Sequence, residues 1–280
     1  MRLFLALLLA SLLAAGSLMA DAVDDKVRGL VDNQSYTTHQ RLIEIIFRDR
    51  AQFFLEDGRL DVIKVVNTLK ENGLLDIFYR GTPRDLKATF RSAQNPTFYL
   101  KAITDVLAEL GYNFYITAHM RQDEYLFEWA IAYKSDHAID PALLARRLAA
   151  YGVVIEDINK EQNNWIYDLI ATEPTLPDAH PLLADSEEPL TLLSPQGEYW
   201  IALDELGQKV GMRRRTGGVW FPYAAFYDRD LRILKVYALE RGVRTFAPEV
   251  PDGAAYLKLT DNYTTENLRH GIVLWLESNP

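Results

Sequence analysis

The residues best suited to bind a ligand lie in the last third of the chain. Three consecutive arginines, Arg213, Arg214 and Arg215, form its densest positive run. On a strand, Arg213 and Arg215 would share one face, because side chains alternate along a strand, and two guanidinium groups on one face can bind carboxylates or an anionic glycan. The alternative is protective, since positive charges on an edge strand discourage sheets from pairing edge to edge.

Aromatic side chains are frequent in the same region. They are Tyr199, Trp200, Trp220, Phe221, Tyr223, Phe226, Tyr227 and Trp275. Exposed rings can stack on sugar faces while their polar atoms bind hydroxyl groups, although alternation along strands assigns about half of them to a core. The predicted ligand or partner surface therefore consists of Trp200, Arg213, Arg215, Trp220 and Tyr223.

The sequence lacks the spacings that catalysis and metal binding require. The five histidines, which contain no pair at i, i+2 or i, i+4, are His39, His119, His137, His180 and His270. There is no cysteine, which excludes thiol catalysis and thiolate metal sites. Nucleophile elbows, zinc-protease motifs and phosphate-binding loops are also missing. We expect no catalytic, cofactor-binding or metal-binding residues and no enzyme; the alternative, an uncharacterised hydrolase, needs distant acids and histidines to converge in one pocket.

Composition narrows the class of protein further. Of 280 residues, 49% are apolar and 25% are charged, as in globular proteins. The formal net charge of −9 argues against a nucleic-acid partner, because that binding depends on clustered Lys and Arg.

The N-terminus has the pattern of a secretory signal peptide over residues 1–22. Arg2 precedes an apolar run at residues 3–13, and small residues follow up to Ala22. Together with the absence of cysteine, this pattern predicts export to a bacterial periplasm, with no stable membrane span after cleavage. The alternative is an uncleaved leader that anchors the protein in the membrane.

Two helices are expected between residues 23 and 73, as a helical hairpin. Apolar residues recur at helical spacing from Thr38 to Phe54, and again at residues 61–72, where Gly73 ends the pattern.

Residues 74–171 have the order β-α-β-β-α-β. Strands are expected at 74–80, 113–120, 125–133 and 153–158, and 165–170 is expected to continue the same sheet. Asn95-Pro96 and Asp140-Pro141 begin the two helices. This order predicts a ferredoxin-like domain, a split βαβ arrangement with helices on one face of the sheet.

The rest of the chain changes in character. Residues 172–189 contain four prolines and an acidic cluster and are expected to form a linker. Seven short strands follow within residues 190–280, at 190–193, 199–203, 210–214, 219–227, 233–239, 255–259 and 272–276. This spacing is typical of a β-sandwich of immunoglobulin-like or jelly-roll type. The fold class predicted for the whole chain is α+β.

Part of this β-rich region resembles a known family. The segments Val219-Trp220-Phe221-Pro222, Tyr227-Asp228, Phe246-Ala247-Pro248 and 256–261 are similar to the β-domain of the maltose-operon periplasmic protein family. The resemblance implies a periplasmic β-domain with a possible connection to saccharides. It assigns no site residues.

These features together predict an exported, non-enzymatic cell-envelope protein. Its two domains would serve as docking or structural modules in a periplasmic assembly, with unidentified envelope proteins as partners. The alternative is binding of carbohydrate or peptidoglycan through the C-terminal domain.

Overall fold

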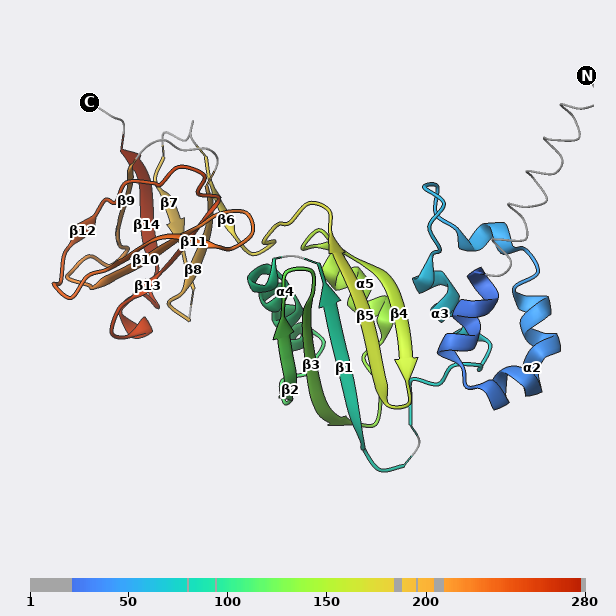
Figure 1. The fold of residues 1–280 in the computed structure, drawn as a ribbon. Helices are drawn as coiled ribbons and strands as arrows, with labels where there is room; N and C mark the ends of the chain where they lie inside the picture. The colour runs from blue at the N-terminus through green and yellow to red at the C-terminus, as the bar shows by residue number, and fades with distance from the viewer. Residues whose placement is uncertain are drawn as a thin grey trace, which may run out of the picture. The chain divides into compact units, whose positions relative to one another are not determined.

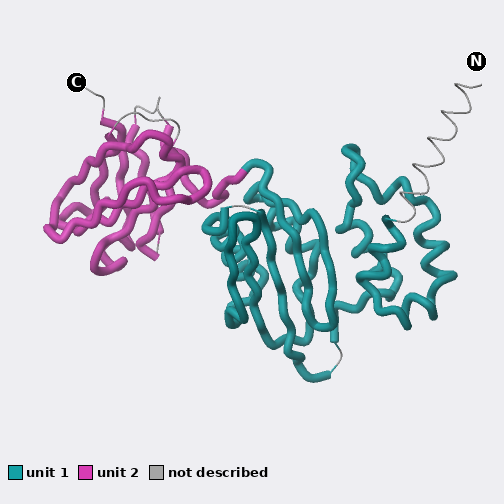
Figure 2. Tube along the Cα trace, in the orientation of Figure 1, with its two compact units in different colours: residues 1–173 teal, residues 174–280 magenta. Residues whose placement is uncertain are grey.

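The computed structural model describes residues 22–79, 81–93, 95–183, 188–194, 196–203 and 209–277. The predicted signal peptide, up to residue 21, lies outside the described residues. The protein is of mixed α+β class and divides into two compact units, residues 1–173 and 174–280 (Figure 2). Among the described residues, no helix combines the length and the apolar character needed to cross a membrane.

The first unit begins with three helices and a 3-10 turn. Residues 22–30 are helical, followed by α2 (Asn33–Ile46), η1 (Arg50–Phe53) and α3 (Val62–Glu71). The side chains of Asp32 and Asp61 cap α2 and α3 by accepting backbone hydrogen bonds. The predicted two-helix hairpin is therefore wrong in its first half, because two helices precede the turn at 50–53.

A five-stranded sheet follows, in the order β2-β3-β1-β5-β4. Its strands are β1 (Arg84–Ser92), β2 (Ile116–Gln122), β3 (Phe127–Ser135), β4 (Val153–Glu161) and β5 (Asn164–Ala171). β1 and β5 are parallel, and the other neighbours are antiparallel. The helices α4 (Pro96–Glu109) and α5 (Pro141–Ala149) lie on the same face of the sheet (Figure 1).

The predicted first strand at 74–80 is wrong. Its described residues, 74–79, contain an isolated bridge between Phe78 and His137 and no strand, and β1 lies further along at Arg84–Ser92. Leu86, Ala88 and Phe90 are buried on the helix-covered face. The segment expected to continue the sheet does so as β5, which pairs with β4 and lies between β1 and β4.

Charged contacts join the N-terminal helices to the sheet unit. Lys70 Nζ lies 2.5 Å from Asp140 Oδ2, and the same aspartate caps α5. Lys26 Nζ lies 2.6 Å from Asp157 Oδ1 on β4 and donates to the backbone oxygen of Ile158 at 3.2 Å. The edge strand β4 is therefore covered by the N-terminal helices.

The second unit contains two sheets, in the orders β11-β10-β13-β8-β6 and β12-β9-β14-β7. The strands are β6 (His180–Leu182), β7 (Leu190–Leu192), β8 (Tyr199–Leu203), β9 (Lys209–Arg214), β10 (Pro222–Tyr227), β11 (Ile233–Ala238), β12 (Thr245–Phe246), β13 (Tyr256–Asp261) and β14 (Ile272–Glu277). Seven of them match the predicted runs. β6 corrects the linker prediction, because it lies inside residues 172–189 and pairs with β8.

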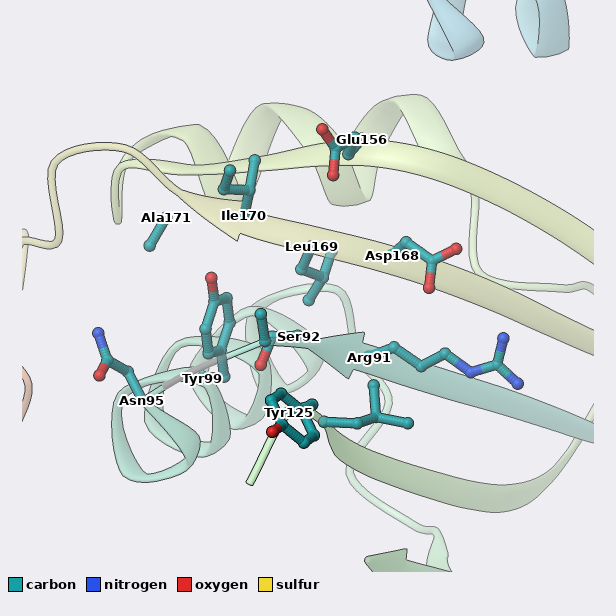
Figure 3. Close-up of a pocket in the computed structure, with 12 residues that line it drawn as sticks. Arg91, Ser92, Asn95, Tyr99, Tyr125, Glu156, Asp168, Leu169, Ile170 and Ala171 are labelled. Carbon is teal, nitrogen blue, oxygen red and sulfur yellow. The ribbon is translucent and has the colours of Figure 1, made fainter. Parts of the chain in front are cut away.

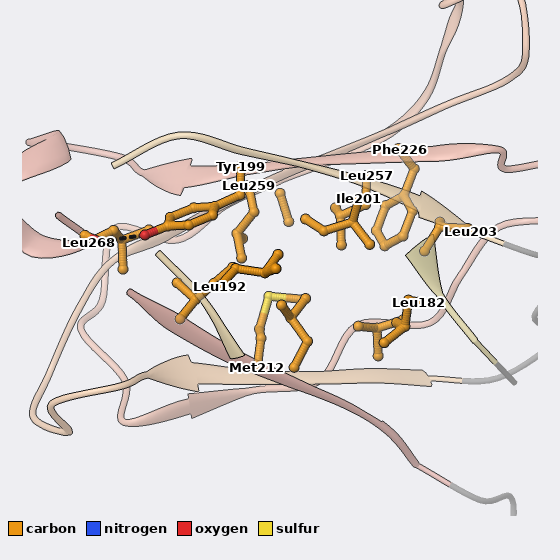
Figure 4. Packing of buried hydrophobic residues seen from close by; sticks show 14 of the residues in the cluster. Leu182, Leu192, Tyr199, Ile201, Leu203, Met212, Phe226, Leu257, Leu259 and Leu268 are labelled. Carbon is orange, nitrogen blue, oxygen red and sulfur yellow. Dashed lines mark hydrogen bonds between the residues drawn. The ribbon is translucent and has the colours of Figure 1, made fainter. Parts of the chain in front are cut away.

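One hydrophobic core lies between these sheets. Ile201, Phe226 and Leu257 come from one sheet, and Leu192 and Met212 come from the other (Figure 4). Tyr199 closes one end of the core, where its hydroxyl donates to the backbone oxygen of Leu268 at 2.7 Å. Alternation along each strand thus places one face of each sheet in a common interior.

Candidate functional site

Trp220 does not belong to an exposed ligand surface. Its side chain is 0% exposed and lies in the core of the second unit. The residue forms an isolated β-bridge with Val243 just before β10 begins. The prediction of Trp220 as a ligand or partner residue is wrong, because tertiary contacts bury a ring that sequence alternation left undecided.

Arg213 and Arg215 do not share one face of a strand, contrary to the sequence prediction. β9 ends at Arg214, so Arg215 lies beyond it, and Arg215 Nε donates to the backbone oxygen of His270 at 2.8 Å. Arg213 lies on β9 and is exposed. β9 is flanked by β12 and β14, so the alternative role of protecting a sheet edge does not hold for this strand either.

Trp200 and Tyr223 lie on one outer face of the five-stranded sheet in the second unit. Lys258 on β13 is in register with Trp200 on β8 and with Ala225 on β10. Tyr223 is two residues before Ala225, so it lies on the same face of the sheet as Trp200. The Trp200 ring lies 5.3 Å from the Tyr227 ring, and Lys258 Nζ lies 5.6 Å from the centre of the Trp200 ring. Lys258 also pairs with Glu198 at 3.0 Å. The structure thus groups two predicted residues with charged neighbours.

The edge strand β2 is exposed along its whole length. All seven of its residues are exposed, including Ile116 at 70% and Met120 at 50%. A bulge shifts the register between Thr117 and His119. Beside the start of β2 is a cavity of about 600 Å³, lined in part by Leu86, Tyr115 and Tyr133.

Glu128 on β3 joins β2 and β1 through its carboxylate. Oε2 accepts from Arg91 Nε at 2.6 Å, and Oε1 lies 2.7 Å from His119 Nε2. The hydrogen bond with His119 is the largest cause that lowers the pKa of Glu128, and Arg91 adds to it. Arg91 is also in register with Asp168 on β5, so a row of charged side chains crosses the face that α4 and α5 leave open.

A second cavity of about 410 Å³ opens where β1 ends (Figure 3). Its charged lining residues are Arg91, Glu156 and Asp168, and the rings of Tyr99 and Tyr125 line it as well. Burial raises the pKa of Asp168, and the charges of Asp157 and Glu156 act in the same direction. Sequence reasoning missed this cavity, because its residues come together through the parallel pairing of β1 and β5.

Among the described residues, no group of three or more His, Asp or Glu side chains is placed to hold a metal ion. His119 and His137 contact different carboxylates: His119 pairs with Glu128, and His137 Nδ1 lies 2.7 Å from Asp136 Oδ1. No family model, curated protein or solved structure matches the chain.

Proposed function

We propose that the chain is an exported, non-enzymatic cell-envelope protein that docks a partner protein by strand addition at β2. We further infer that its first unit is a ferredoxin-like variant and its second a β-sandwich. The split βαβ order β1-α4-β2 with β3 in between supports the first inference, and two sheets around one core support the second. Export is supported by residues 1–22 of the sequence, and a periplasmic location by the resemblance at residues 219–261.

The exposure of β2 carries the docking proposal. An edge strand presents unpaired backbone N–H and C=O groups along one side, which can pair with a strand of another chain. Lys26 and the N-terminal helices cover the other edge of this sheet, β4. β2 lies at the uncovered end of the strand order, and each of its residues is exposed.

A cavity beside β2 supplies the specificity that backbone pairing lacks. Strand addition takes its affinity from main-chain hydrogen bonds and its specificity from pockets for alternate side chains. The cavity of about 600 Å³ lies at the start of β2, next to Phe114, which is 91% exposed. β11 in the second unit is also an exposed edge, and both edges have protective features, Lys235 on β11 and a bulge with Arg121 on β2. The cavity therefore favours β2 as the docking edge.

The charge of β2 indicates what kind of strand it pairs with. The strand contains His119 and Arg121 and no acidic residue. Arg121 has one carboxylate neighbour within its own chain, Asp123 at 3.6 Å. A second copy pairing through its own β2 would offer Arg121 no further carboxylate from that strand, and arginine opposite arginine in a strand pair is destabilising. The occupant we propose is an extended segment of another protein, with an acidic side chain near Arg121 and a large apolar side chain in the cavity.

Site-specific photocrosslinking in cells tests this proposal on the full chain. A photoreactive residue at Ile116 or Met120 should give one adduct of defined mass with another protein. The same residue at Ile233, which is 61% exposed on β11, is the matched control and should give none. Arg121→Glu should abolish the adduct at Met120, whereas Arg232→Glu, at an exposed position before β11, should leave it intact.

Two outcomes contradict the proposal. One is a lack of any adduct at both β2 positions while the protein is folded and exported. The other is an adduct with the mass of two copies of the chain, which would assign β2 to self-association.

The outer face around Trp200 supports glycan binding as a second candidate function. Trp200, Tyr223 and Tyr227 share a face with the polar pair Lys258 and Glu198, and rings beside polar groups suit sugar recognition. A pull-down on peptidoglycan or soluble glycans tests it. Retention should fall in Trp200→Ala and persist in Ile116→Lys, and retention that is unchanged in Trp200→Ala contradicts this function.

A further inference from the structure

The cavity at the end of β1 has a position that suits a ligand. β1 ends at Ser92, opposite Leu169, while β5 continues to Ala171. The 123–126 turn leads into β3, which is the neighbour of β1 on the other side from β5. The cavity thus lies beyond the carboxyl end of β1, beside its parallel neighbour β5. Its volume of about 410 Å³ is within the range of small-molecule pockets.

Charges of both signs line this cavity on neighbouring strands. Arg91 on β1 is in register with Asp168 on β5, and Figure 3 shows the two side chains extending from adjacent strands. Glu156 follows on β4, at the bulge between Ile155 and Asp157. β1 therefore contributes a guanidinium group to the lining, and β5 and β4 each contribute a carboxylate.

The neighbours of these groups hold them in place. Glu128 binds Arg91 through Nε, and a guanidinium has two terminal amino groups that can bind a carboxylate in a bidentate way. Lys26 is bonded to Asp157, Ile158 and Asn159, so this nearby cation is engaged outside the cavity. Asp168 lies near the acids Glu156 and Asp157 and near the cations Arg91 and Lys26, and Glu156 Oε1 lies 3.8 Å from Arg59 Nη1 at the exposed side.

Apolar surface completes the lining. Tyr99, Tyr125, Leu169 and Ile170 contribute rings and aliphatic groups. The Tyr99 hydroxyl is hydrogen-bonded to the backbone of Ala171, which fixes one ring against the end of β5. A ligand with an apolar side chain between its charged ends matches this lining.

We propose that the cavity binds a small zwitterion of one or two amino-acid residues, a free amino acid or a dipeptide. Its ammonium group would lie between Asp168 and Glu156, its carboxylate against Arg91, and its side chain against Tyr99, Leu169 and Ile170. A dipeptide spans about 7 Å when extended, whereas neighbouring strands are about 4.8 Å apart. The ligand can therefore reach from Arg91 across β5.

Calorimetric titration of the full chain with alanyl-leucine tests this proposal. N-acetyl-alanyl-leucine lacks the ammonium group, and alanyl-leucine amide lacks the carboxylate, so each end can be removed in turn. We expect each modification to weaken binding by about tenfold or more, because a hydrogen bond between charged groups is lost. Asp168→Asn and Arg91→Lys should weaken binding of the unmodified dipeptide, and the matched control Glu161→Gln, at the exposed end of β4, should not.

The pairing of variants with ligands makes the test specific. In Asp168→Asn, the penalty for N-acetylation should shrink, because only Glu156 is left to bind the ammonium group. In Arg91→Lys, which keeps the charge beside Glu128 but loses the planar fork, the penalty for the amide should shrink. A lack of measurable heat with alanyl-leucine overturns the proposal, as does equal binding of all three compounds to the unmodified protein.

Discussion

Glu128 accepts a hydrogen bond from Arg91 across the β1/β3 pair, with 2.6 Å between Oε2 and Nε. The Glu128 side chain is 15% exposed, so the bond is partly shielded from water. Its other oxygen is held by His119 on β2. One carboxylate therefore ties three neighbouring strands together at the base of the charged row and positions Arg91 at the rim of the cavity.

Glu128→Gln is expected to destabilise the folded chain by about 1–2 kcal/mol at pH 7, because hydrogen bonds to an ionised group are lost. The pKa of Glu128 is lowered on folding from its ordinary value of 4.5. Its stabilising contribution is therefore complete above that value and disappears as the pH falls through the lower folded pKa. Urea unfolding at several pH values measures this. The difference from the unmodified chain should shrink in acid, and Glu124→Gln, exposed in the nearby turn, should show no difference.

Asp168→Asn is expected to have the opposite sign. Burial raises the pKa of Asp168 above its ordinary value of 3.8, so the ionised form weakens the fold. Folding favours the protonated carboxyl group. Its contribution to the free energy of unfolding is therefore complete below the unfolded pKa and is lost as the pH rises through the folded pKa. At pH 7 the variant should melt at a higher temperature than the unmodified chain, and the difference should vanish in acid. A lower melting temperature at pH 7 would show that the Asp168 carboxylate stabilises the fold.

Local features of the fold were predictable from the sequence because their causes are local. Asp140-Pro141 marks the start of α5, where the aspartate side chain accepts from the backbone N–H of Ala142 and Leu143. Gly152 follows the helix with φ +69°, a conformation that glycine adopts without strain. Most strands of the second unit were also predicted, since short apolar runs between turn residues mark them.

Pairing between distant segments was not predictable in the same way. β1 was missed although Leu86, Ala88 and Phe90 alternate with polar residues, a period that indicates a half-buried strand. The neighbours Arg91 and Asp168 meet only because β5 enters the sheet beside β1, which no local pattern specifies. The same reason explains Trp220, whose burial depends on the packing of both sheets.

Trp220→Ala is expected to destabilise the second unit by about 3–5 kcal/mol, as for other large buried aromatic residues. Trp220 Nε1 has no hydrogen-bond partner among the described residues, so Trp220→Phe should cost less, because it removes no bond and keeps a ring in the core. Trp200→Ala, on the half-exposed outer face, is the control with the smaller effect. Urea unfolding followed by circular dichroism measures all three, and a Trp220→Ala protein as stable as Trp200→Ala would contradict the buried position.

Asp261→Ala is expected to destabilise the second unit by about 3 kcal/mol, because a buried carboxylate that satisfies three backbone amides is lost. Asp261 is 6% exposed; its Oδ2 accepts from Phe221 N at 2.9 Å, and its Oδ1 accepts from Tyr263 N at 3.0 Å and Thr264 N at 3.1 Å. These bonds join the end of β13 to the start of β10. Hydrogen exchange should therefore speed up at those three amides in the variant before the unit unfolds globally. Asp252→Ala, in an exposed turn before β13, is the matched control and should leave both stability and exchange unchanged. Unchanged exchange at the three amides in Asp261→Ala would show that the carboxylate does not hold this corner together.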